Sequence, residues 1–349
     1  MEKQPIKVVI WGFGAMGSGM ARMILSKRGF EITGVCDLHP KRVGKPISEV
    51  LNQSIPSHQD IIIQADVDTL IHKDRCDICL LATDSFTKKA FPKIKFILEQ
   101  GVNVISTAEE MAYPKANEPE LTMALDRIAK EHGVTVLGTG INPGMMMDTL
   151  VLLMTGVMAD VESIQVARIN SLSPFGETVM EEQGVGKSLD EYHDLIAKGE
   201  LAGHVGFKES AHMICDGLGL RDITFEQSMK PIITDVDRKS PYGFAKQGHL
   251  AGIDMEARVT HQGKRFLELR HPQQIEPQLA GVFTGDYIDI VGSPNVHLSV
   301  KPEIDGGIGT IAICVNMIPH VINSRPGLKT MIDLPIPRAI LGDVRDFLE

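Results

Sequence analysis

The chain has 349 residues, of which 43% are hydrophobic and 23% are charged, and its formal net charge is −10. This length exceeds what one hydrophobic core usually serves, so we expect two domains in an ordinary soluble globular protein. The acidic balance disfavours nucleic acid as a partner, because phosphate binding needs concentrated Lys and Arg. We also expect no membrane insertion, because no apolar run approaches the length that crosses a bilayer. A small-molecule partner fits this composition better.

The chain starts with MEKQPIKVVIWG, which passes directly into a strand pattern without the apolar core of a signal peptide. We therefore expect a cytoplasmic protein. Five scattered cysteines indicate reduced thiols rather than a disulfide framework. Cys76 and Cys79 form a C-x-x-C, but CDICLLAT is typical of a buried strand, which would point the two side chains to opposite faces. No second pair supplies further ligands, so we expect no metal site.

Strand and helix patterns alternate through the first part of the chain. Apolar strands are predicted at 6–12, 30–37, 76–83, 102–107 and 134–140, and helices at 15–29, 86–101 and 120–133. This alternation predicts a parallel sheet with helices on both faces. We interpret residues 1–145 as a dinucleotide-binding Rossmann domain with a doubly wound sheet, within an α/β fold class.

Three glycines with G-x-G-x-x-G spacing lie between the first strand and the first helix. The first permits a tight turn, the second lets a pyrophosphate approach the backbone, and the third lets helix and strand pack closely. Asp37 ends the next strand, about 20 residues beyond the first glycine, where a carboxylate binds the adenosine ribose. The predicted cofactor loop is Gly12, Phe13, Gly14, Ala15, Met16 and Gly17.

The residues after Asp37 leave the choice between NAD and NADP open. A carboxylate at this position favours NAD because it repels the 2′-phosphate of NADP. Lys41 and Arg42 follow within reach of that phosphate, so both cofactors are possible. The alternative interpretation of Lys41 and Arg42 is a solvated loop.

Polar residues follow the ends of the other predicted parallel strands, where ligands of such folds bind. We predict cofactor contacts at Ala82, Thr83, Asp84, Ser106, Thr107, Asn142 and Pro143, and substrate contacts at Thr139, Gly140 and Gly144.

Glu109 and Glu110 are adjacent carboxylates at the same predicted crevice. A glutamate beside the nicotinamide could deprotonate an amine or activate the water that opens an imine, and partial burial would raise its pKa for this work. The alternative is that both acids stabilise the start of a helix.

The second part of the chain, residues 146–307, is richer in strands. A buried helix is predicted within 139–158, strands at 161–170, 223–234, 249–260, 264–271, 286–292 and 295–302, and helices at 188–200 and 207–219. The pattern at 256–270 predicts a hairpin that turns at 261–264. We expect an α+β domain with a mixed or antiparallel sheet, which binds substrate and covers its extended sheet face in a homodimer.

The segment that begins at Arg168 is too polar and glycine-rich for an ordinary strand exit. We predict that Arg168, Asn170, Ser171 and Thr178 close over the substrate, with a surface loop as the alternative. The apolar pattern at 309–328 predicts a helix that stops at Arg325-Pro326-Gly327. Residues 308–349 are expected to pack back on the first domain, with 329–349 over its surface.

Five blocks stand out along the chain: VVIWGFGAMGSGMAR, VISTAEEMAYP, GTGINPGMMMDTL, RINSLSPFGETVMEEQGVG and GLKTMIDLPIPR. Together they resemble those of the 2,4-diaminopentanoate dehydrogenase family, which is related to dihydrodipicolinate reductase and to NAD(P)-dependent amine dehydrogenases. The resemblance implies oxidative deamination of 2,4-diaminopentanoate to 2-amino-4-oxopentanoate, with reduction of NAD or NADP and release of ammonia, in anaerobic ornithine degradation. It places the family's essential glutamate in STAEEM, with Glu110 favoured and Glu109 second.

Three alternatives remain beside this resemblance. Dihydrodipicolinate reductase carries a His-His and Lys signature that is missing here. Homoserine dehydrogenase carries a lysine in TANK, where this chain has TAEE. A non-catalytic NAD(P)-sensing protein would use the same cofactor loop while its other crevice residues stay idle.

Overall fold

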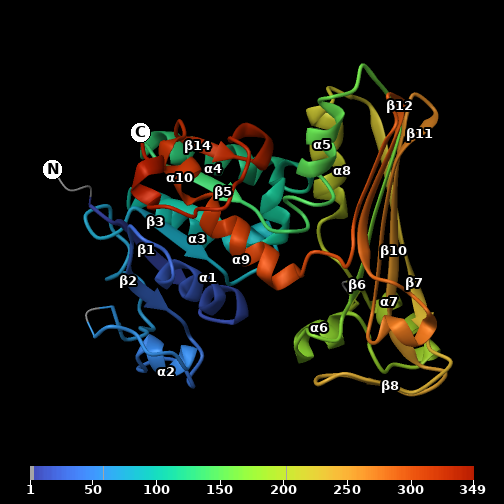
Figure 1. Ribbon diagram of the computed structural model, residues 1–349, viewed down its shortest axis with the longest axis horizontal. Helices are drawn as coiled ribbons and strands as arrows, with labels where there is room; N and C mark the ends of the chain where they lie inside the picture. Colours follow the sequence, from blue (N-terminus) through green and yellow to red (C-terminus); the bar gives the residue numbers. More distant parts are fainter. Residues whose placement is uncertain (1–3, 58, 202) are drawn as a thin grey trace. The chain divides into compact units, whose positions relative to one another are not determined.

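The computed structural model describes residues 4–57, 59–201 and 203–349 (Figure 1). They form two compact units. Unit 1 takes the described residues of Met1–Met145 together with Asp305–Glu349, and unit 2 is Met146–Ile304. Each unit is built around its own six-stranded sheet.

The sheet of unit 1 has the strand order β14-β5-β4-β3-β1-β2, and every pair in it is parallel. Its strands are β1 (Ile6–Trp11), β2 (Phe30–Cys36), β3 (Ile78–Leu81), β4 (Asn103–Ser106), β5 (Thr135–Gly138) and β14 (Gly327–Lys329). The order reverses at β1, so a topological switch point lies between β1 and β3. The predicted doubly wound parallel sheet is confirmed.

Helices cover both faces of this sheet, as the parallel strands require. The helices are α1 (Ala15–Leu25), α2 (Ile47–Leu51), α3 (Thr87–Glu99), α4 (Pro119–Glu131), α9 (Gly306–Asn316) and α10 (Ile318–Asn323). Ile10 on one face packs in a cluster with residues of α1, α9 and α10, whereas Val9 on the other face packs with residues of α3 and α4. Alternation along β1 therefore divides the core of unit 1 into two layers.

The carboxyl-terminal segment differs from the sequence prediction. The single helix expected at 309–328 is two helices, because Pro319 at the start of α10 cannot continue α9. Residues 329–349 do not simply trail over the surface, since β14 pairs with β5, and Met331, Ile340 and Val344 are buried in the core.

The window Gly306–Asn323 is long and apolar enough to cross a membrane by length and composition alone. The expectation that no apolar run reaches that length is therefore wrong for this segment. Half of the window is buried inside the structure, and core helices of soluble proteins meet the same criterion.

The sheet of unit 2 is mixed, with the order β13-β12-β6-β11-β10-β7. Its strands are β6 (Asp160–Ser171), β7 (Ile223–Ile233), β10 (Leu250–His261), β11 (Lys264–Gln274), β12 (Gly285–Ser293) and β13 (Val296–Val300), and β8 (Arg238–Lys239) and β9 (Phe244–Ala245) form a separate ribbon. Only the β6–β11 pair is parallel among these strands. The predicted hairpin is confirmed, and Gln262 and Gly263 form its turn with positive φ angles.

Helices lie against one face of this sheet. They are α5 (Thr149–Thr155), α7 (Leu189–Lys198) and α8 (Phe207–Gly217), whose apolar residues share a cluster with alternate residues of the strands, and the shorter α6 (Glu177–Glu182) follows β6. The helix expected within 139–158 is shorter than predicted and is only partly buried, with Val151 as its one fully buried residue.

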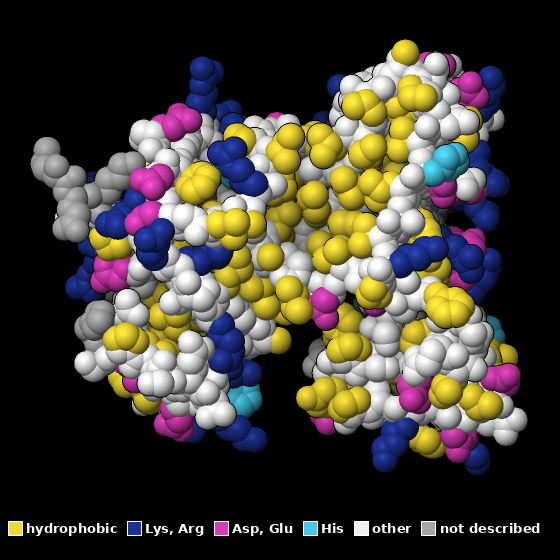
Figure 2. All heavy atoms as spheres, viewed as in Figure 1, with side chains coloured by type: hydrophobic (Ala, Val, Ile, Leu, Met, Phe, Trp, Pro, Cys, Tyr) yellow, Lys and Arg dark blue, Asp and Glu magenta, His cyan; other side chains and the backbone are white. Residues whose placement is uncertain are grey.

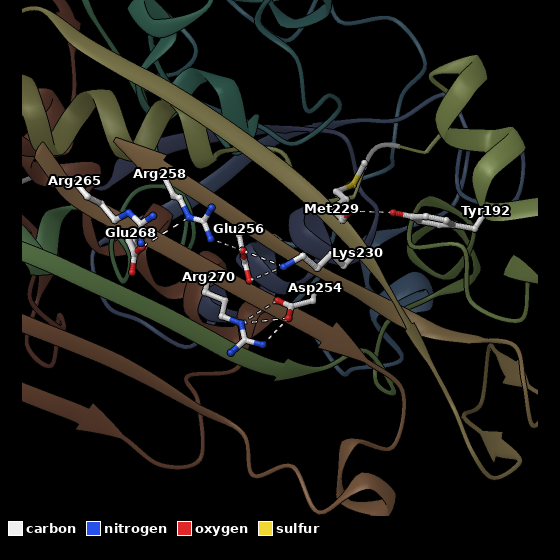
Figure 3. Close-up of polar contacts among 9 residues, drawn as sticks. All are labelled: Tyr192, Met229, Lys230, Asp254, Glu256, Arg258, Arg265, Glu268 and Arg270. Carbon is white, nitrogen blue, oxygen red and sulfur yellow. Dashed lines mark hydrogen bonds and ion pairs between the residues drawn. The ribbon is translucent and has the colours of Figure 1, made fainter. Parts of the chain in front are cut away.

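The opposite face of the sheet carries charged side chains from β7, β10 and β11 (Figure 3). Asp254 pairs with Arg270 at 2.6 Å, and Glu256 lies 3.3 Å from Lys230 and 3.2 Å from Arg258. Glu268 pairs with Arg265 at 2.7 Å. The charges of this face are therefore mostly balanced within the face itself.

All five cysteines are free and buried. The expectation for the C-x-x-C pair is wrong in detail, because Cys76 precedes β3 and packs in the same hydrophobic cluster as Cys79. Burial raises the pKa of Cys76 to about 11, with Asp77 adding to that effect and the hydrogen bond to the His72 carbonyl opposing it. These thiols are suited to core packing rather than to nucleophilic chemistry.

Candidate active site

The glycine loop of unit 1 has the geometry that its spacing predicts. Gly12 has a φ of +95°, and a Cβ there would lie 2.4 Å from the Ala82 carbonyl oxygen. A Cβ on Gly17 would lie 1.8 Å from the Gly12 carbonyl oxygen, so α1 packs against the turn only because Gly17 has no side chain. A Cβ on Gly14 would meet nothing within 4 Å. The space over Gly14, at the start of α1, is thus open to a ligand.

Asp37 lies beside this loop and is almost fully buried. Its carboxylate accepts hydrogen bonds from Phe13 N and His39 N, both at 2.6 Å, and from the Arg42 guanidinium at 3.2 Å. Burial by itself would raise the pKa of Asp37, but the two backbone hydrogen bonds and Arg42 hold it below its usual value. Asp37 therefore ties the glycine loop to the end of β2, while Lys41 is exposed.

Thr83 and Asp84 follow β3 and form a polar network with Lys93 of α3. Lys93 Nζ donates to Asp84 Oδ2 at 2.7 Å and to Thr83 Oγ1 at 2.9 Å, and the Thr83 hydroxyl donates to Asp84 at 2.6 Å. Lys93 Nζ also lies 6.0 Å from the ring centroid of Trp11, the last residue of β1. Lys93 was not predicted as a site residue, since it lies on a helix with no local motif.

The loop after β5 is held closely against α9. Ile141 N donates to Thr310 Oγ1 at 3.2 Å, and Cys314 Sγ lies 3.8 Å from the Thr139 carbonyl oxygen. Gly144 has a φ of +125°, and a Cβ there would lie 2.6 Å from Gly140 N. Within the described part of the chain, the buried Thr139 hydroxyl makes no hydrogen bond.

The two glutamates lie in the 3₁₀ helix η1 (Glu109–Ala112), which follows β4. Ser106 and Thr107 precede it; the Ser106 hydroxyl accepts from Ala108 N at 3.2 Å, and Thr107 N donates to the Leu81 carbonyl at 3.0 Å. Both glutamates are partly buried. Glu110 Oε2 accepts a hydrogen bond from Thr87 N at 2.7 Å.

Taken together, the predicted residues of unit 1 occupy segments that follow five neighbouring parallel strands. These segments follow β1, β2, β3, β4 and β5, and the carboxyl ends of parallel strands lie at one edge of the sheet. This arrangement brings the glycine loop, the Thr83 network, the glutamates and the Thr139 loop to the same edge.

The predicted residues of unit 2 do not form a loop. Arg168, Asn170 and Ser171 lie inside β6, which pairs with β11 and β12 on either side. The segment is polar because it lies on a buried polar part of the sheet, not because it leaves the sheet. Thr178 lies in α6, and its side chain is outside the described part of the structure.

Arg168 is held in a buried ion pair. Its guanidinium lies 2.5 Å from Asp286 Oδ1, and both side chains are 3% exposed. Arg168 also donates to the Ile304 carbonyl, while Asp286 Oδ2 accepts from Ile304 N at 2.9 Å. Substrate contact by this guanidinium, which already has two partners, stays a prediction.

Sheet register groups further polar residues with Asn170. His271 and Gln273 are buried on β11, Gln273 is paired in register with Asn170, and the Asn170 side-chain oxygen is buried without a hydrogen bond among the described residues. Gln183 Nε2 donates to Gln273 Oε1 at 3.3 Å. Sequence reasoning did not select His271 or Gln273, because only strand pairing places Gln273 beside Asn170 and His271 against the Arg168 carbonyl.

His271 lies against a second histidine, the partly buried His204, with 4.7 Å between ring centroids. The Arg168 carbonyl accepts from His271 Nδ1 at 2.7 Å. Burial lowers the pKa of His204 to about 3, and Arg168 adds to the effect. Burial also puts the pKa of His271 well below its usual value. Both rings are therefore neutral parts of the fold near pH 7.

Neither a cluster of metal-ligating side chains nor a patch of one charge indicates a second site among the described residues. Over residues 4–57, 59–201 and 203–349, no group of three or more His, Cys, Asp or Glu side chains could hold a metal ion. On the face drawn in Figure 2, Lys and Arg side chains are interspersed with Asp and Glu.

Comparison with known proteins agrees with this geometry. The family model of the 2,4-diaminopentanoate dehydrogenase C-terminal domain matches residues 145–349. A 2,4-diaminopentanoate dehydrogenase of Acetoanaerobium sticklandii is 56% identical over 349 residues, which cover 100% of this chain and 98% of that protein.

Two amine dehydrogenases are more distant. One from Streptomyces virginiae is 22% identical over 359 residues, covering 96% of this chain and 98% of that protein. The solved structure of the other, from Mycobacterium smegmatis, matches with a TM-score of 0.86 and 25% identity over 97% of this chain and 98% of that chain.

Proposed function

Because the chain belongs to the 2,4-diaminopentanoate dehydrogenase family, we propose that it oxidatively deaminates 2,4-diaminopentanoate with NAD or NADP. The C4 ammonium substrate, water and the oxidised cofactor give 2-amino-4-oxopentanoate, an ammonium ion, the reduced cofactor and one proton. The reverse reaction is reductive amination of the ketone. The observation that carries the proposal is the gathering of the glycine loop and the glutamates at one edge of the parallel sheet.

The residues of the glycine loop fit a dinucleotide. Open space over Gly14 at the start of an eleven-residue helix suits a pyrophosphate, whose charge interacts favourably with the helix N-terminus. Gly12, Phe13, Ala15, Met16 and Gly17 complete this loop. A dinucleotide held by this loop would supply the acceptor for the hydride that leaves the amine-bearing carbon of the substrate.

The choice between the two cofactors depends on the ribose end of the site. Asp37 disfavours the 2′-phosphate of NADP, but Arg42 neutralises part of the Asp37 charge, and the exposed Lys41 adds another cation. This combination supports use of both cofactors. Further cofactor contacts are proposed at Ala82, Thr83, Asp84, Ser106, Thr107, Asn142 and Pro143.

One glutamate of the pair Glu109–Glu110 does the proton chemistry in this proposal. It takes a proton from the substrate ammonium and releases that proton to solvent. As a carboxylate again, it takes a proton from the water that adds to the imine. Such general acid and base catalysis contributes about 10² to 10⁴ in rate. A carboxylate suits this substrate, since it pairs with an ammonium before it accepts the proton.

The substrate is proposed to contact Thr139, Gly140 and Gly144 in unit 1 and Arg168, Asn170, Ser171 and Thr178 in unit 2. Two of these residues, Thr139 and Asn170, have buried polar atoms without a hydrogen bond in the described chain. Buried polar atoms are usually hydrogen-bonded, so we propose that each of these atoms, within its own unit, meets a polar group of a ligand.

We also propose that the protein is a cytoplasmic homodimer that acts in ornithine degradation. The helix-free face of the sheet in unit 2 is the proposed dimer surface (Figure 3). Its ion pairs neutralise most of the charges that would be buried when the face is covered. Sedimentation equilibrium of the protein and of Arg270→Glu, which opposes Asp254, tests this part; a monomeric starting protein would contradict it.

The activity itself is tested by following absorbance at 340 nm after adding 2,4-diaminopentanoate to the protein with each cofactor. We expect steady reduction of the cofactor and stoichiometric release of ammonia. A flat trace together with tight cofactor binding would instead favour a non-catalytic NAD(P)-sensing protein. Ornithine and simple amines, offered in parallel, measure how strictly the α-amino acid end is required.

A further inference from the structure

We propose that Asp84 and Lys93 together recognise the adenine base of the dinucleotide, with Lys93 holding the Asp84 carboxylate in place. This inference rests on the proposed function, because it specifies how one end of the NAD or NADP of that reaction is bound. From sequence, Asp84 is a cofactor contact without a stated role, and Lys93 is not a site residue.

Asp84 and Lys93 form an ion pair with one carboxylate oxygen left over. Lys93 Nζ lies 2.7 Å from Asp84 Oδ2, and the two side chains are only 31% and 13% exposed, respectively. Thr83 Oγ1 accepts from Lys93 Nζ at 2.9 Å and donates to the same Asp84 oxygen at 2.6 Å. Both contacts to the carboxylate use Oδ2, so Oδ1 is available as an acceptor among the described residues.

This pair lies directly beside the glycine loop. A Cβ on Gly12 would lie 2.4 Å from the Ala82 carbonyl oxygen and 2.9 Å from Thr83 Cγ2, so the segment after β3 forms one wall of the loop. Lys93 Nζ lies 6.0 Å from the ring centroid of Trp11, which immediately precedes Gly12. The pair is therefore next to the turn at which the dinucleotide is proposed to bind.

The pair also lies toward the ribose end of the site. Trp11 is paired in register with Cys36, the last residue of β2. Burial and then two neighbouring carboxylates raise the pKa of Cys36 to about 11, whereas the charge of Lys93 opposes them, so Lys93 is close to the end of β2. Cys36 immediately precedes Asp37, the proposed ribose ligand. Adenine adjoins that ribose in a dinucleotide, so it is the group that this pair is placed to meet.

The chemistry of the pair matches one edge of adenine. That edge presents a donor, the 6-amino group, beside an acceptor, N7, and amide side chains recognise it with an acceptor beside a donor. The Asp84 carboxylate and the Lys93 ammonium present the same two functions, since an ammonium has three donors and Lys93 uses two of them here. Hypoxanthine has an oxygen in place of the 6-amino group, so it would turn an acceptor toward the carboxylate.

The test compares the binding of NAD with that of nicotinamide hypoxanthine dinucleotide, in which an oxygen replaces the 6-amino group. Trp11 is the single tryptophan of the full-length chain and adjoins the glycine loop, so its fluorescence reports binding without turnover. We expect the protein to bind NAD at least about tenfold more tightly than the hypoxanthine dinucleotide. Because both affinities are measured on one protein, a loss of folded protein affects them equally.

Three variants separate recognition from support. Asp84→Asn can turn an amide N–H toward the hypoxanthine oxygen, so its preference for NAD should fall below about threefold. Lys93→Met leaves the Asp84 carboxylate without its cation, so NAD should bind at least about threefold more weakly and the preference should shrink. Lys95→Met is the matched control on the same helix, since Lys95 Nζ lies 3.7 Å from Glu99 Oε1 on the exposed surface, and it should change neither quantity.

Equal affinity of the unmodified protein for the two dinucleotides would overturn the proposal. An undiminished preference for NAD in Asp84→Asn would do the same, because it is the result that a purely structural role of Asp84 predicts. Unchanged NAD binding in Lys93→Met would contradict the supporting role of Lys93. Failure of the proposed function has a different signature: a protein that prefers NAD to the hypoxanthine dinucleotide, yet does not reduce NAD with 2,4-diaminopentanoate, keeps this inference and loses only the deamination.

Discussion

The two six-stranded sheets hold their candidate site residues in different parts of the fold. In unit 1 these residues lie on loops beyond the ends of parallel strands, and open space lies over Gly14. In unit 2 Arg168, Asn170 and Ser171 lie within β6, Thr178 lies in α6, and the buried pair Arg168–Asp286 joins β6 to β12 inside the sheet.

The loop residues of unit 1 can therefore be substituted without disturbing their sheet, whereas the strand residues of unit 2 cannot. A loop residue beside open space contributes to binding more than to folding. A polar residue inside a strand must first satisfy its own buried charge or hydrogen bond. Substitutions in unit 1 should therefore change binding first, whereas substitutions in unit 2 should change stability first.

The largest effect is expected from breaking the buried ion pair of unit 2. Arg168→Met leaves the Asp286 carboxylate buried with the Ile304 N–H as its hydrogen-bond donor and no cation beside it among the described residues, and should cost about 3–5 kcal/mol in the free energy of unfolding. Denaturant unfolding measures the loss. The control is Arg168→Met with Asp286→Leu, which removes both charges and should recover most of the stability; equal stability of the single variant would contradict this account.

A smaller effect is expected from two glycines of the loop in unit 1. Gly17→Ala forces the α1 start away from Gly12 and should cost about 1–3 kcal/mol of stability. Gly14→Ala meets no protein atom, so it should unfold like the parent protein yet bind NAD and NADP more weakly. Calorimetry measures the stability of each variant and its affinity for NAD and NADP. Unchanged cofactor affinity in Gly14→Ala would place the pyrophosphate elsewhere.

Mild acid should affect the two units differently. His204 and His271 are neutral in the fold, with lowered pKa values, so the unfolded chain binds more protons below about pH 6.5. Their contribution to stability is present above that pH and falls by about 1.4 kcal/mol per pH unit for each histidine as pH decreases. Asp37 in unit 1, with its lowered pKa, loses its contribution only at lower pH, below about 3.9.

The measurement is the slope of unfolding free energy between pH 6.5 and pH 5. His271→Gln keeps a donor for the Arg168 carbonyl and should make that slope shallower. An unchanged slope in this variant would show that His271 is protonated in the folded protein.

The smallest effect is expected at the ribose end of the loop. Arg42→Ala leaves the Asp37 charge without its guanidinium partner, so the affinity for NADP should fall about tenfold relative to that for NAD. The exposed Lys41→Ala serves as the matched control for loss of one positive charge. Equal losses for both cofactors would indicate a structural role for Arg42 instead.

Much of this architecture could be predicted where the relevant residues are close in sequence. The strand and helix alternation of unit 1, the hairpin of β10 and β11, and the glycine loop with Asp37 all depend on short spacings. Backbone sterics at Gly12 and Gly17 act over a few residues, so the pattern carries that information directly.

Other features could not be predicted because their partners are distant in sequence. Arg168 and Asp286 are 118 residues apart, and Glu110 caps a helix that starts 23 residues earlier. β14 adds a strand to a sheet whose other strands end nearly two hundred residues before it. A polar segment such as the one at Arg168 has the same composition in a loop as in a buried strand.

Local spacing was enough to predict the two sheets, the glycine loop and the turn that carries the two glutamates, since strand alternation and backbone turns depend on residues that are close in sequence. Tertiary structure decided which polar groups are already paired: Glu110 with the start of α3, and Arg168 with Asp286. The physical reason is that hydrogen bonding and burial depend on which distant segments meet, and that information enters only when the chain packs.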